Sequence, residues 1–387
     1  MTDYKLTEKE FEYIVGIKRD LHMHPELAHH EFRTTEKIKE ALSSLPGIDI
    51  LDTGFRTGLI AVIRGREEGK KILLRADIDA IVQNEEYESP WKSQTPGVMH
   101  ACGHDLHTSS LIGAAVILSK IKAAGKLKNT VYLLFQPAEE GTTGARMVLD
   151  SGVLDEIKPD MCFGFHNWPK LRSGTVACHK GVLMSGKRNF TINIKGSGGH
   201  GSMPHLNIDP IVCSAAVIQS LQTVVSRNMD PLDSAVLSIS MIEGGKPVNV
   251  VADDVTMTAT IRSLSDKALD RAIERVESIT MNTAHAYECE AEIDWKERIP
   301  SVFNTDEMYE VALRAAEETG AEITDAEPSL ASEDFALYRT VAPSFFYWIG
   351  STPEGEEPED LHRPRFHTDD SIMKTAAELF VRAAMTE

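Results

Sequence analysis

The sequence predicts an α/β protein of two domains, in which a smaller α+β domain is inserted into a larger one. The chain has 387 residues, which exceeds the usual size of a single hydrophobic core. Strand-like and helical segments alternate in its first half, as is typical of a sheet with helices on its faces. A different order of segments runs from about residue 188 to 298, and the first pattern then returns.

The larger domain is expected to comprise residues 1–187 and 299–387. Its strands are predicted from short, continuous apolar runs, and its helices from apolar residues at helical spacing. They are strands at 71–77, 130–136 and 344–349, and helices at 106–121, 306–319 and 371–385.

The inserted domain is expected to comprise residues 188–298. Its predicted elements are strands at 190–195, 234–242, 253–263 and 290–296, and helices at 209–226 and 267–286. The order strand, helix, strand, strand, helix, strand is ferredoxin-like. A segment of this length can fold as a domain by itself.

Composition and charge exclude several classes of partner. Hydrophobic residues make up 42% and charged residues 26%, as in ordinary globular proteins. A formal net charge of −19 argues against nucleic acid or an anionic membrane as a partner. No apolar run is long enough for a transmembrane helix or has the form of a signal peptide. The cysteines are scattered and odd in number, so we expect free thiols and a cytoplasmic protein; they are Cys102, Cys162, Cys178, Cys213 and Cys289.

The segment 99–107 (MHACGHDLH) contains one thiol, three imidazoles and a carboxylate at the start of a predicted helix. Soft and borderline ligands on a rigid turn suit zinc, manganese or cobalt. The alternative is a small buried cysteine beside histidines that cap the helix.

The segment 135–141 (FQPAEEG) follows an apolar strand, so its two glutamates should lie at the carboxyl end of the sheet, where α/β sites form. Adjacent glutamates on a bend point in different directions. One can bind a metal while the other transfers protons, as hydrolysis requires. The alternative is an exposed acidic pair, since the chain has 59 Asp and Glu residues.

Two further histidines are candidate ligands. His166 follows an apolar run in 161–169 (MCFGFHNWP), and His362 lies in the polar segment 360–367 (DLHRPRFH). Either could instead be a hydrogen-bonded structural histidine. Together with the preceding motifs they provide five donors and a spare carboxylate, which suits two metals with open positions better than a closed four-ligand site. The absence of paired Cys-x-x-Cys ligands also argues against a zinc ribbon.

These motifs resemble those of the aminoacylase-type dinuclear metallohydrolases, in the subgroup of hippurate hydrolases, plant auxin-conjugate hydrolases and bacterial N-acetyl-diaminopimelate deacetylases. The matching segments run from 21–27 (LHMHPEL) to 361–364 (LHRP), almost the whole chain. The resemblance implies a zinc-peptidase-like catalytic domain with a mixed sheet flanked by helices. It also implies that the inserted ferredoxin-like domain serves as a lid and in dimerisation.

The resemblance implies a role for each site residue. Cys102 would bridge two divalent ions (Zn, Mn, Co or Ni), and the remaining ligands would be His104, Glu140, His166 and His362. Glu139 would be the general base. Asp77 would orient a metal ligand without binding the metal itself.

The family also places residues of the inserted domain in the reaction. His200 would reach the active site of the partner subunit and stabilise the developing oxyanion. Asn249 and Arg262 would hold the carboxylate of the substrate. Closure of the domain would exclude water from the site, and the enzyme would act as a homodimer.

The expected reaction is hydrolysis of the amide bond of an N-acyl amino acid, such as an N-acetyl or benzoyl conjugate. One alternative is a dipeptidase or carboxypeptidase with the same metal chemistry. Others are a metal-storage or ligand-binding protein without activity, and a redox role for Cys102. In relatives the segment that corresponds to 79–85 (DAIVQNE) contains a proline and borders the substrate; this chain lacks that proline, so the relatives' specificity does not transfer directly. Gly201 stands where relatives usually have alanine, and we expect no effect of this change on catalysis.

Overall fold

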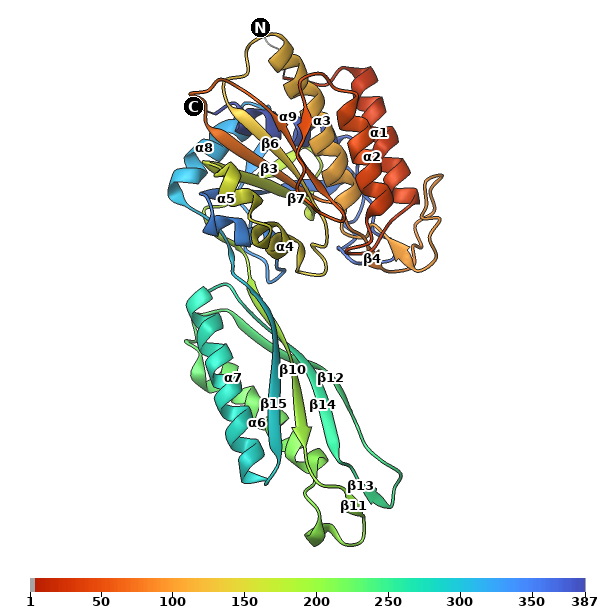
Figure 1. The fold of residues 1–387 in the computed structure, drawn as a ribbon, viewed down its shortest axis with the longest axis vertical. Helices are drawn as coiled ribbons and strands as arrows, with labels where there is room; N and C mark the ends of the chain where they lie inside the picture. Colours follow the sequence, from red (N-terminus) through yellow and green to blue (C-terminus); the bar gives the residue numbers. More distant parts are fainter. Residues whose placement is uncertain (1–3, 387) are drawn as a thin grey trace. The chain divides into compact units, whose positions relative to one another are not determined.

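The computed structural model describes residues 4–386, which form two compact units (Figure 1). The first unit contains the chain up to Gly181, Phe303–Glu327 and the chain from Asp334 onward. The second contains Val182–Val302 and Pro328–Glu333. The predicted insertion therefore lies inside the second unit. Within residues 4–386, no helix combines the length and the apolar character that crossing a membrane requires.

The first unit contains an eight-stranded mixed sheet with helices packed against it, which confirms the predicted α/β class. The strand order is β1-β2-β6-β3-β7-β18-β8-β17, and the central strands β6, β3, β7 and β18 are parallel. The bounds are β1 (Asp49–Ile50), β2 (Leu59–Ile63), β3 (Lys71–Asp77), β6 (Thr130–Gln136), β7 (Met161–Arg172), β8 (Thr175–Ala177), β17 (Glu322–Thr324) and β18 (Ser344–Thr352). A separate pair consists of β4 (Ile81–Val82) and β5 (Val98–Met99).

Five of the helices share one apolar core with the sheet; they are α1 (Glu8–Met23), α2 (Phe32–Ser43), α3 (His104–Ala123), α8 (Asp306–Glu317) and α9 (Ile372–Ala384). Helix α3 is buried along almost its whole length and packs against α1 and α9 (Figure 1). Shorter helical segments are α4 (Gly144–Asp150), α5 (Val153–Ile157) and η2 (Asp334–Thr340). Helix α3 begins immediately after Gly103, which has a φ of +90° that favours glycine.

The second unit contains a four-stranded antiparallel sheet of order β12-β14-β10-β15. Its elements are β10 (Gly186–Lys195), α6 (Pro210–Asn228), β12 (Ala235–Gly244), β14 (Asp254–Ser263), α7 (Asp266–Ala286) and β15 (Glu290–Ile299). Buried and less buried residues alternate along β14, and the buried ones share a core with α6 and α7. Helices α6 and α7 therefore cover one face of the sheet.

The remaining short elements of the second unit lie at one end of this sheet (Figure 1). They are β11 (Gly199–His200), η1 (Pro204–Leu206) and β13 (Val250–Val251), and β11 pairs with β13. The strands β9 (Gly181–Met184) and β16 (Val302–Asn304) mark where the chain passes from one unit to the other.

The register of the larger sheet brings candidate residues to one edge. Strands β3 and β6 are parallel and pair Asp77 with Gln136, the last residue of each strand. Strand β7 pairs Gly164 with Arg75, so His166 follows at about the level of Asp77. The carboxyl ends of parallel strands form the edge at which α/β proteins bind ligands.

Candidate active site

The five candidate metal ligands come from four separate segments of the first unit. Cys102 and His104 lie at the start of α3, and Glu140 follows strand β6. His166 lies on β7, and His362 lies in the loop after β18. The backbone N–H of His362 donates to the carbonyl oxygen of Ala101 at 2.8 Å, which holds this loop beside Cys102.

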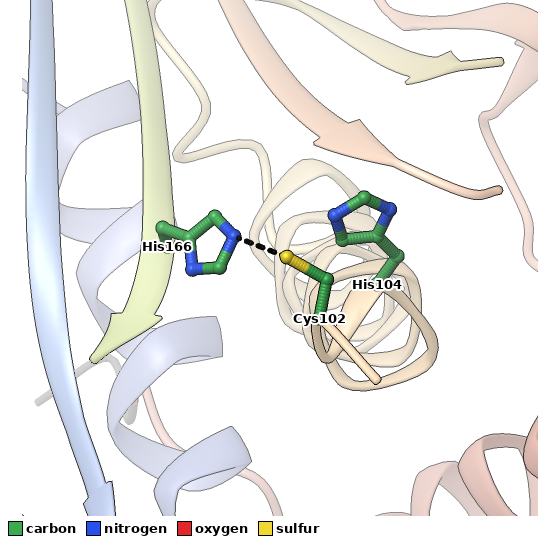
Figure 2. Close-up of side chains that lie close together, drawn as sticks. All are labelled: Cys102, His104 and His166. Carbon is green, nitrogen blue, oxygen red and sulfur yellow. Dashed lines mark hydrogen bonds between the residues drawn. The ribbon is translucent and has the colours of Figure 1, made fainter. Parts of the chain in front are cut away.

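Cys102 lies at the centre of the group. Its Sγ is 3.3 Å from Nε2 of His166 and 3.3 Å from Nε2 of His362, although these histidines are 64 and 260 residues away in the sequence. Figure 2 shows Cys102 between the rings of His104 and His166, with the thiol directed at His166.

Two sets of three donors share the Cys102 sulfur. One set is Cys102, His104 and His166, and the other is Cys102, Glu140 and His362. Within each set, the candidate ligand atoms all lie within 4.8 Å of one another. Oε1 of Glu140 is also 3.1 Å from Nε2 of His362 and 3.9 Å from Nε2 of His104, so the two sets adjoin. The structure thus brings together all five predicted ligands.

This arrangement fits two divalent cations. Nε2 of His104 is buried and has no hydrogen-bond partner among the described residues. Burial, with the nearby charge of Glu140, raises the pKa of the Cys102 thiol well above its ordinary value. A bound cation favours the thiolate and satisfies the free imidazole nitrogen. Sulfur, imidazole and carboxylate donors are those that zinc and related metals prefer.

Hydrogen bonds orient two of the histidines toward this point. The Nδ1–H of His104 donates to the carbonyl oxygen of Asp79 at 2.9 Å, and that of His166 donates to the carbonyl oxygen of Asn167 at 2.6 Å. In both rings Nε2 is therefore the nitrogen that faces the candidate metal site. Burial lowers the pKa of His166 to about 3, so its imidazole is neutral, as metal binding requires.

Glu140 is ionised in this environment. Burial acts to raise its pKa, but the hydrogen bond from His362 and the charge of His104 outweigh this effect and lower the pKa to about 2. The neighbouring carboxyl group of Glu139 is also buried and, with His104 and Glu140, forms a further set of donors within 4.8 Å. Glu139 is thus a second carboxylate beside the candidate metal site.

Asp77 contacts a histidine that the sequence analysis did not single out. Its Oδ1 accepts a hydrogen bond from Nδ1 of His107 at 2.6 Å, and its Oδ2 accepts one from the buried guanidinium of Arg75 at 2.6 Å. Nε2 of His104 lies 3.7 Å from Oδ2 of Asp77. Burial acts to raise the pKa of Asp77, but the neighbouring side chains of His104, Arg75 and His107 outweigh it and hold the pKa well below its ordinary value. Nε2 of His107 accepts the N–H of Asn167 at 3.0 Å, so this ring is fixed at both nitrogens.

Asp79 is the carboxylate that holds His104 by a hydrogen bond, and sequence reasoning assigned it no role. Its Oδ1 is 3.2 Å from Nδ1 of His104 and accepts the backbone N–H of Glu139 at 3.1 Å. Its Oδ2 accepts the backbone N–H of Glu140 at 3.0 Å. The second acidic residue of the segment 75–79 (RADID) was the available signal, because two carboxylates directly after a buried strand lie at the functional edge of the sheet.

The other three predicted site residues lie in the second unit. His200, on β11, and Asn249, just before β13, are both exposed and close together, because Gly201 N–H donates to the carbonyl oxygen of Asn249 at 2.8 Å. Arg262 pairs with Lys187 near the other end of β14, and its Nη1 donates to the carbonyl oxygen of Leu330 at 2.8 Å. At about 3.3 Å per residue, the length of β14 places Arg262 more than about 20 Å from His200 and Asn249 within one chain. The structure therefore does not bring these three residues together in one copy of the unit.

Comparisons with known proteins match almost the entire chain. The sequence model of the peptidase family M20/M25/M40 matches residues 73–386. The N-acetylcysteine deacetylase of Bacillus subtilis (strain 168) is 41% identical over 373 residues, which cover 96% of each chain. The N-acetyldiaminopimelate deacetylase of the same strain is 34% identical over 371 residues, which cover 96% of this chain and 97% of the relative.

A solved structure is also similar over its full length. It is a Bacillus subtilis protein described as a dinuclear metal binding peptidase of the M20 family. Its chain is 37% identical, with a TM-score of 0.83 and 98% of both chains covered.

Proposed function

The chain belongs to the peptidase family M20/M25/M40, and we propose that it hydrolyses the amide bond of an N-acyl amino acid with two divalent metal ions, releasing a carboxylic acid and a free amino acid. The observation that carries this proposal is the position of Cys102, whose sulfur lies 3.3 Å from two imidazoles of distant segments. Relatives that are named as deacetylases of N-acetylcysteine and N-acetyldiaminopimelate support this substrate class.

The five convergent donors would hold the metals: Cys102 would bridge the two ions, His104 and His166 would bind one, and Glu140 and His362 the other. When bound, the ions polarise the scissile carbonyl group and acidify the attacking water. The donor set admits zinc, manganese, cobalt or nickel. Five free, buried cysteines among the described residues support a reducing compartment, and we propose the cytoplasm.

Glu139 would act as the general base and then as the general acid. Its carboxyl group is buried beside His104 and Glu140 but belongs to neither three-donor set that shares Cys102. It would accept a proton from the attacking water and deliver that proton to the nitrogen of the leaving amine. Asp77 would act indirectly, because its hydrogen bond fixes His107, whose ring lies against those of His104 and His166.

The second unit would serve as a ferredoxin-like lid and as the surface of a homodimer. Six of its exposed apolar side chains lie at or near the end that carries His200 and support the dimer; they are Met203, Leu206, Met241, Ile242, Val248 and Val250. His200 would stabilise the oxyanion in the active site of the partner. Because Arg262 lies at the other end of β14, the substrate carboxylate would meet Arg262 of one chain and Asn249 of the other.

A mixture of two inactive variants tests this exchange of residues. In a mixed dimer of Glu139→Gln and His200→Ala chains, one site combines an intact Glu139 with an intact His200 from the partner. Random exchange of subunits should therefore restore about a quarter of wild-type activity, since half of the dimers are mixed and one of the two sites in each mixed dimer is complete. A mixture of dimers that stays inactive would contradict the exchange.

Substrate class is tested with the metal-reconstituted enzyme. We expect hydrolysis of one or more of the N-acetyl, N-benzoyl and N-succinyl amino acids, loss of turnover with a chelator, and no turnover by Glu139→Gln at unchanged metal content. Unblocked dipeptides are the control, and preference for them would make the protein a dipeptidase or carboxypeptidase. Near-normal activity of Glu139→Gln would remove Glu139 from the reaction.

A further inference from the structure

The turn that carries Glu139 presents three consecutive backbone N–H groups to two buried carboxyl groups. The N–H of Ala138 donates to Oε1 of Glu31 at 2.8 Å. The next two N–H groups, of Glu139 and Glu140, donate to the two oxygens of Asp79 at 3.1 and 3.0 Å. Such a row of N–H groups is a binding site for an anion, and here side chains of the protein occupy it.

The turn needs this support because its backbone is unfavourable. Ala138 has a φ of +57°, in the left-handed region that residues with a β-carbon seldom adopt. On the carbonyl side, Glu139 C=O accepts the N–H of Thr142 at 2.7 Å, and Ala138 C=O accepts the N–H of Gly144 at 3.1 Å. The Glu31 and Asp79 contacts secure the opposite, N–H side of the same turn.

Glu31 lies at a position from which a side chain ordinarily caps a helix. It occupies the N-cap position of helix α2, yet its side chain makes no capping hydrogen bond to that helix. Glu26 takes this role, because its two carboxylate oxygens accept the N–H groups of Arg33 and Thr34 at 3.1 and 2.8 Å. The carboxyl group of Glu31 is fully buried and instead reaches Ala138, which is 107 residues away.

The backbone of Glu31 is itself anchored to α2. Its carbonyl oxygen accepts the N–H of Thr35 at 2.9 Å and the hydroxyl of Thr35 at 2.6 Å. The same hydroxyl accepts the N–H of Gly58 at 2.8 Å, next to strand β2. Helix α2 and the residue before strand β2 thus hold the backbone of Glu31 in place.

We propose that Glu31 is a positioning residue for the general base: its buried carboxyl group, with that of Asp79, fixes the turn that aims Glu139. This inference rests on the proposed function of Glu139. Glu31 holds the residue before the base, whereas Asp79 holds the base and the adjacent metal ligand Glu140. Loss of the Glu31 side chain therefore displaces the base with little effect on metal binding.

The test compares Glu31→Ala, Glu31→Gln and the matched control Glu26→Ala. In the metal-loaded enzyme, Glu31→Ala should lower kcat roughly 10- to 100-fold with an unchanged KM, since displacement of a catalytic group by about 1 Å has such an effect. Glu31→Gln keeps an oxygen acceptor for Ala138 N–H and should recover most of this loss. Glu26→Ala removes the cap of α2 and should lower stability while kcat stays at the wild-type value. All three should retain wild-type metal content.

Hydrogen–deuterium exchange of the peptide 135–144 provides a readout that needs no substrate. Exchange in this peptide should be faster in Glu31→Ala than in the wild type, and unchanged in Glu26→Ala. The inference would be overturned if Glu31→Ala kept both the wild-type exchange rate and the wild-type kcat. It would also be overturned if Glu26→Ala lost as much kcat as Glu31→Ala, or if Glu31→Ala lost bound metal together with kcat. Failure of the proposed function is recognised separately, because Glu139→Gln would then retain activity whatever Glu31 does.

Discussion

Replacement of His22 by glutamine should remove a contribution to stability that depends on pH. His22 is buried on α1, with Nδ1 2.9 Å from Oδ2 of Asp105 and Nε2 3.2 Å from Oε1 of Glu85. Burial acts to lower its pKa, but the charge of Asp105 and the hydrogen bonds to Asp105 and Glu85 outweigh it and raise the pKa to about 9. Lys18, whose Nζ is 3.9 Å from Asp105 Oδ2, opposes this effect without reversing it.

The expected magnitude follows from the two pKa values of His22. The rise from an ordinary 6.5 to about 9 corresponds to about 3 kcal/mol of folding free energy, at about 1.4 kcal/mol per pH unit. Between these values the folded protein holds a proton that the unfolded chain has lost. The stabilisation is therefore complete below about pH 6.5 and is lost as the pH rises through about 9.

Urea unfolding of the metal-free wild type and His22→Gln, from pH 6 to pH 10, measures this effect. Subtracting the two unfolding free energies cancels the other titrating groups. The difference should fall by about 3 kcal/mol over the range. In a double-mutant cycle with Asp105→Asn, the coupling between the two residues should shrink over the same range. A difference that is constant with pH would show that folding does not raise the pKa of His22.

Two further variants test the site. Cys102→Ser should lower the metal content of the purified enzyme below that of the wild type, because a serine hydroxyl is a far poorer bridging ligand than a thiolate, and elemental analysis checks this. Gly103→Ala places a β-carbon 2.0 Å from Oδ1 of Asn167 at a φ of +90°, whereas Gly97→Ala, at +79°, meets no atom within 4 Å. We expect Gly97→Ala to cost about 1 kcal/mol in unfolding free energy and Gly103→Ala about 2–3 kcal/mol more; equal costs would contradict the crowding at Gly103.

The order and type of the main elements could be predicted because their apolar patterns are strong. Strand β3 was predicted with its observed bounds, since six of its seven residues are buried. The strand predicted at 190–195 begins earlier in the structure, at Gly186. The prediction missed its first residues because Lys187, Arg188 and Asn189 are all partly buried and do not alternate between buried and exposed. Helices α1 and α2 lacked predicted bounds, because many of their residues are charged.

The convergence of the five candidate ligands could be predicted because each lies in a short, chemically distinctive segment, and the family resemblance distinguished His104 and Glu140 from their neighbours. The hydrogen-bond partners of Asp79 and Glu31 could not be predicted, because both carboxyl groups accept from backbone N–H groups, which every residue other than proline carries. The hydrogen bond of Asp77 to His107 was also missed. Three histidines follow one another in the segment 100–107, and only the folded backbone decides which ring each carboxylate meets.

The roles proposed for His200, Asn249 and Arg262 would depend on a second copy of the chain, and they stay predictions. Within one unit Arg262 lies far along β14 from His200 and Asn249, so their convergence on a substrate would require two copies. No local pattern in the sequence identifies such a pairing, because each residue is unremarkable among its neighbours.

The proposed function requires that Cys102 bridge two metal ions. Anomalous diffraction from crystals of the zinc- or manganese-loaded protein would detect this arrangement. We expect two anomalous peaks, each within about 2.3–2.5 Å of the Cys102 sulfur, one beside His104 and His166 and the other beside Glu140 and His362. A single peak, or two peaks that do not share Cys102, would rule out a bridging role for Cys102.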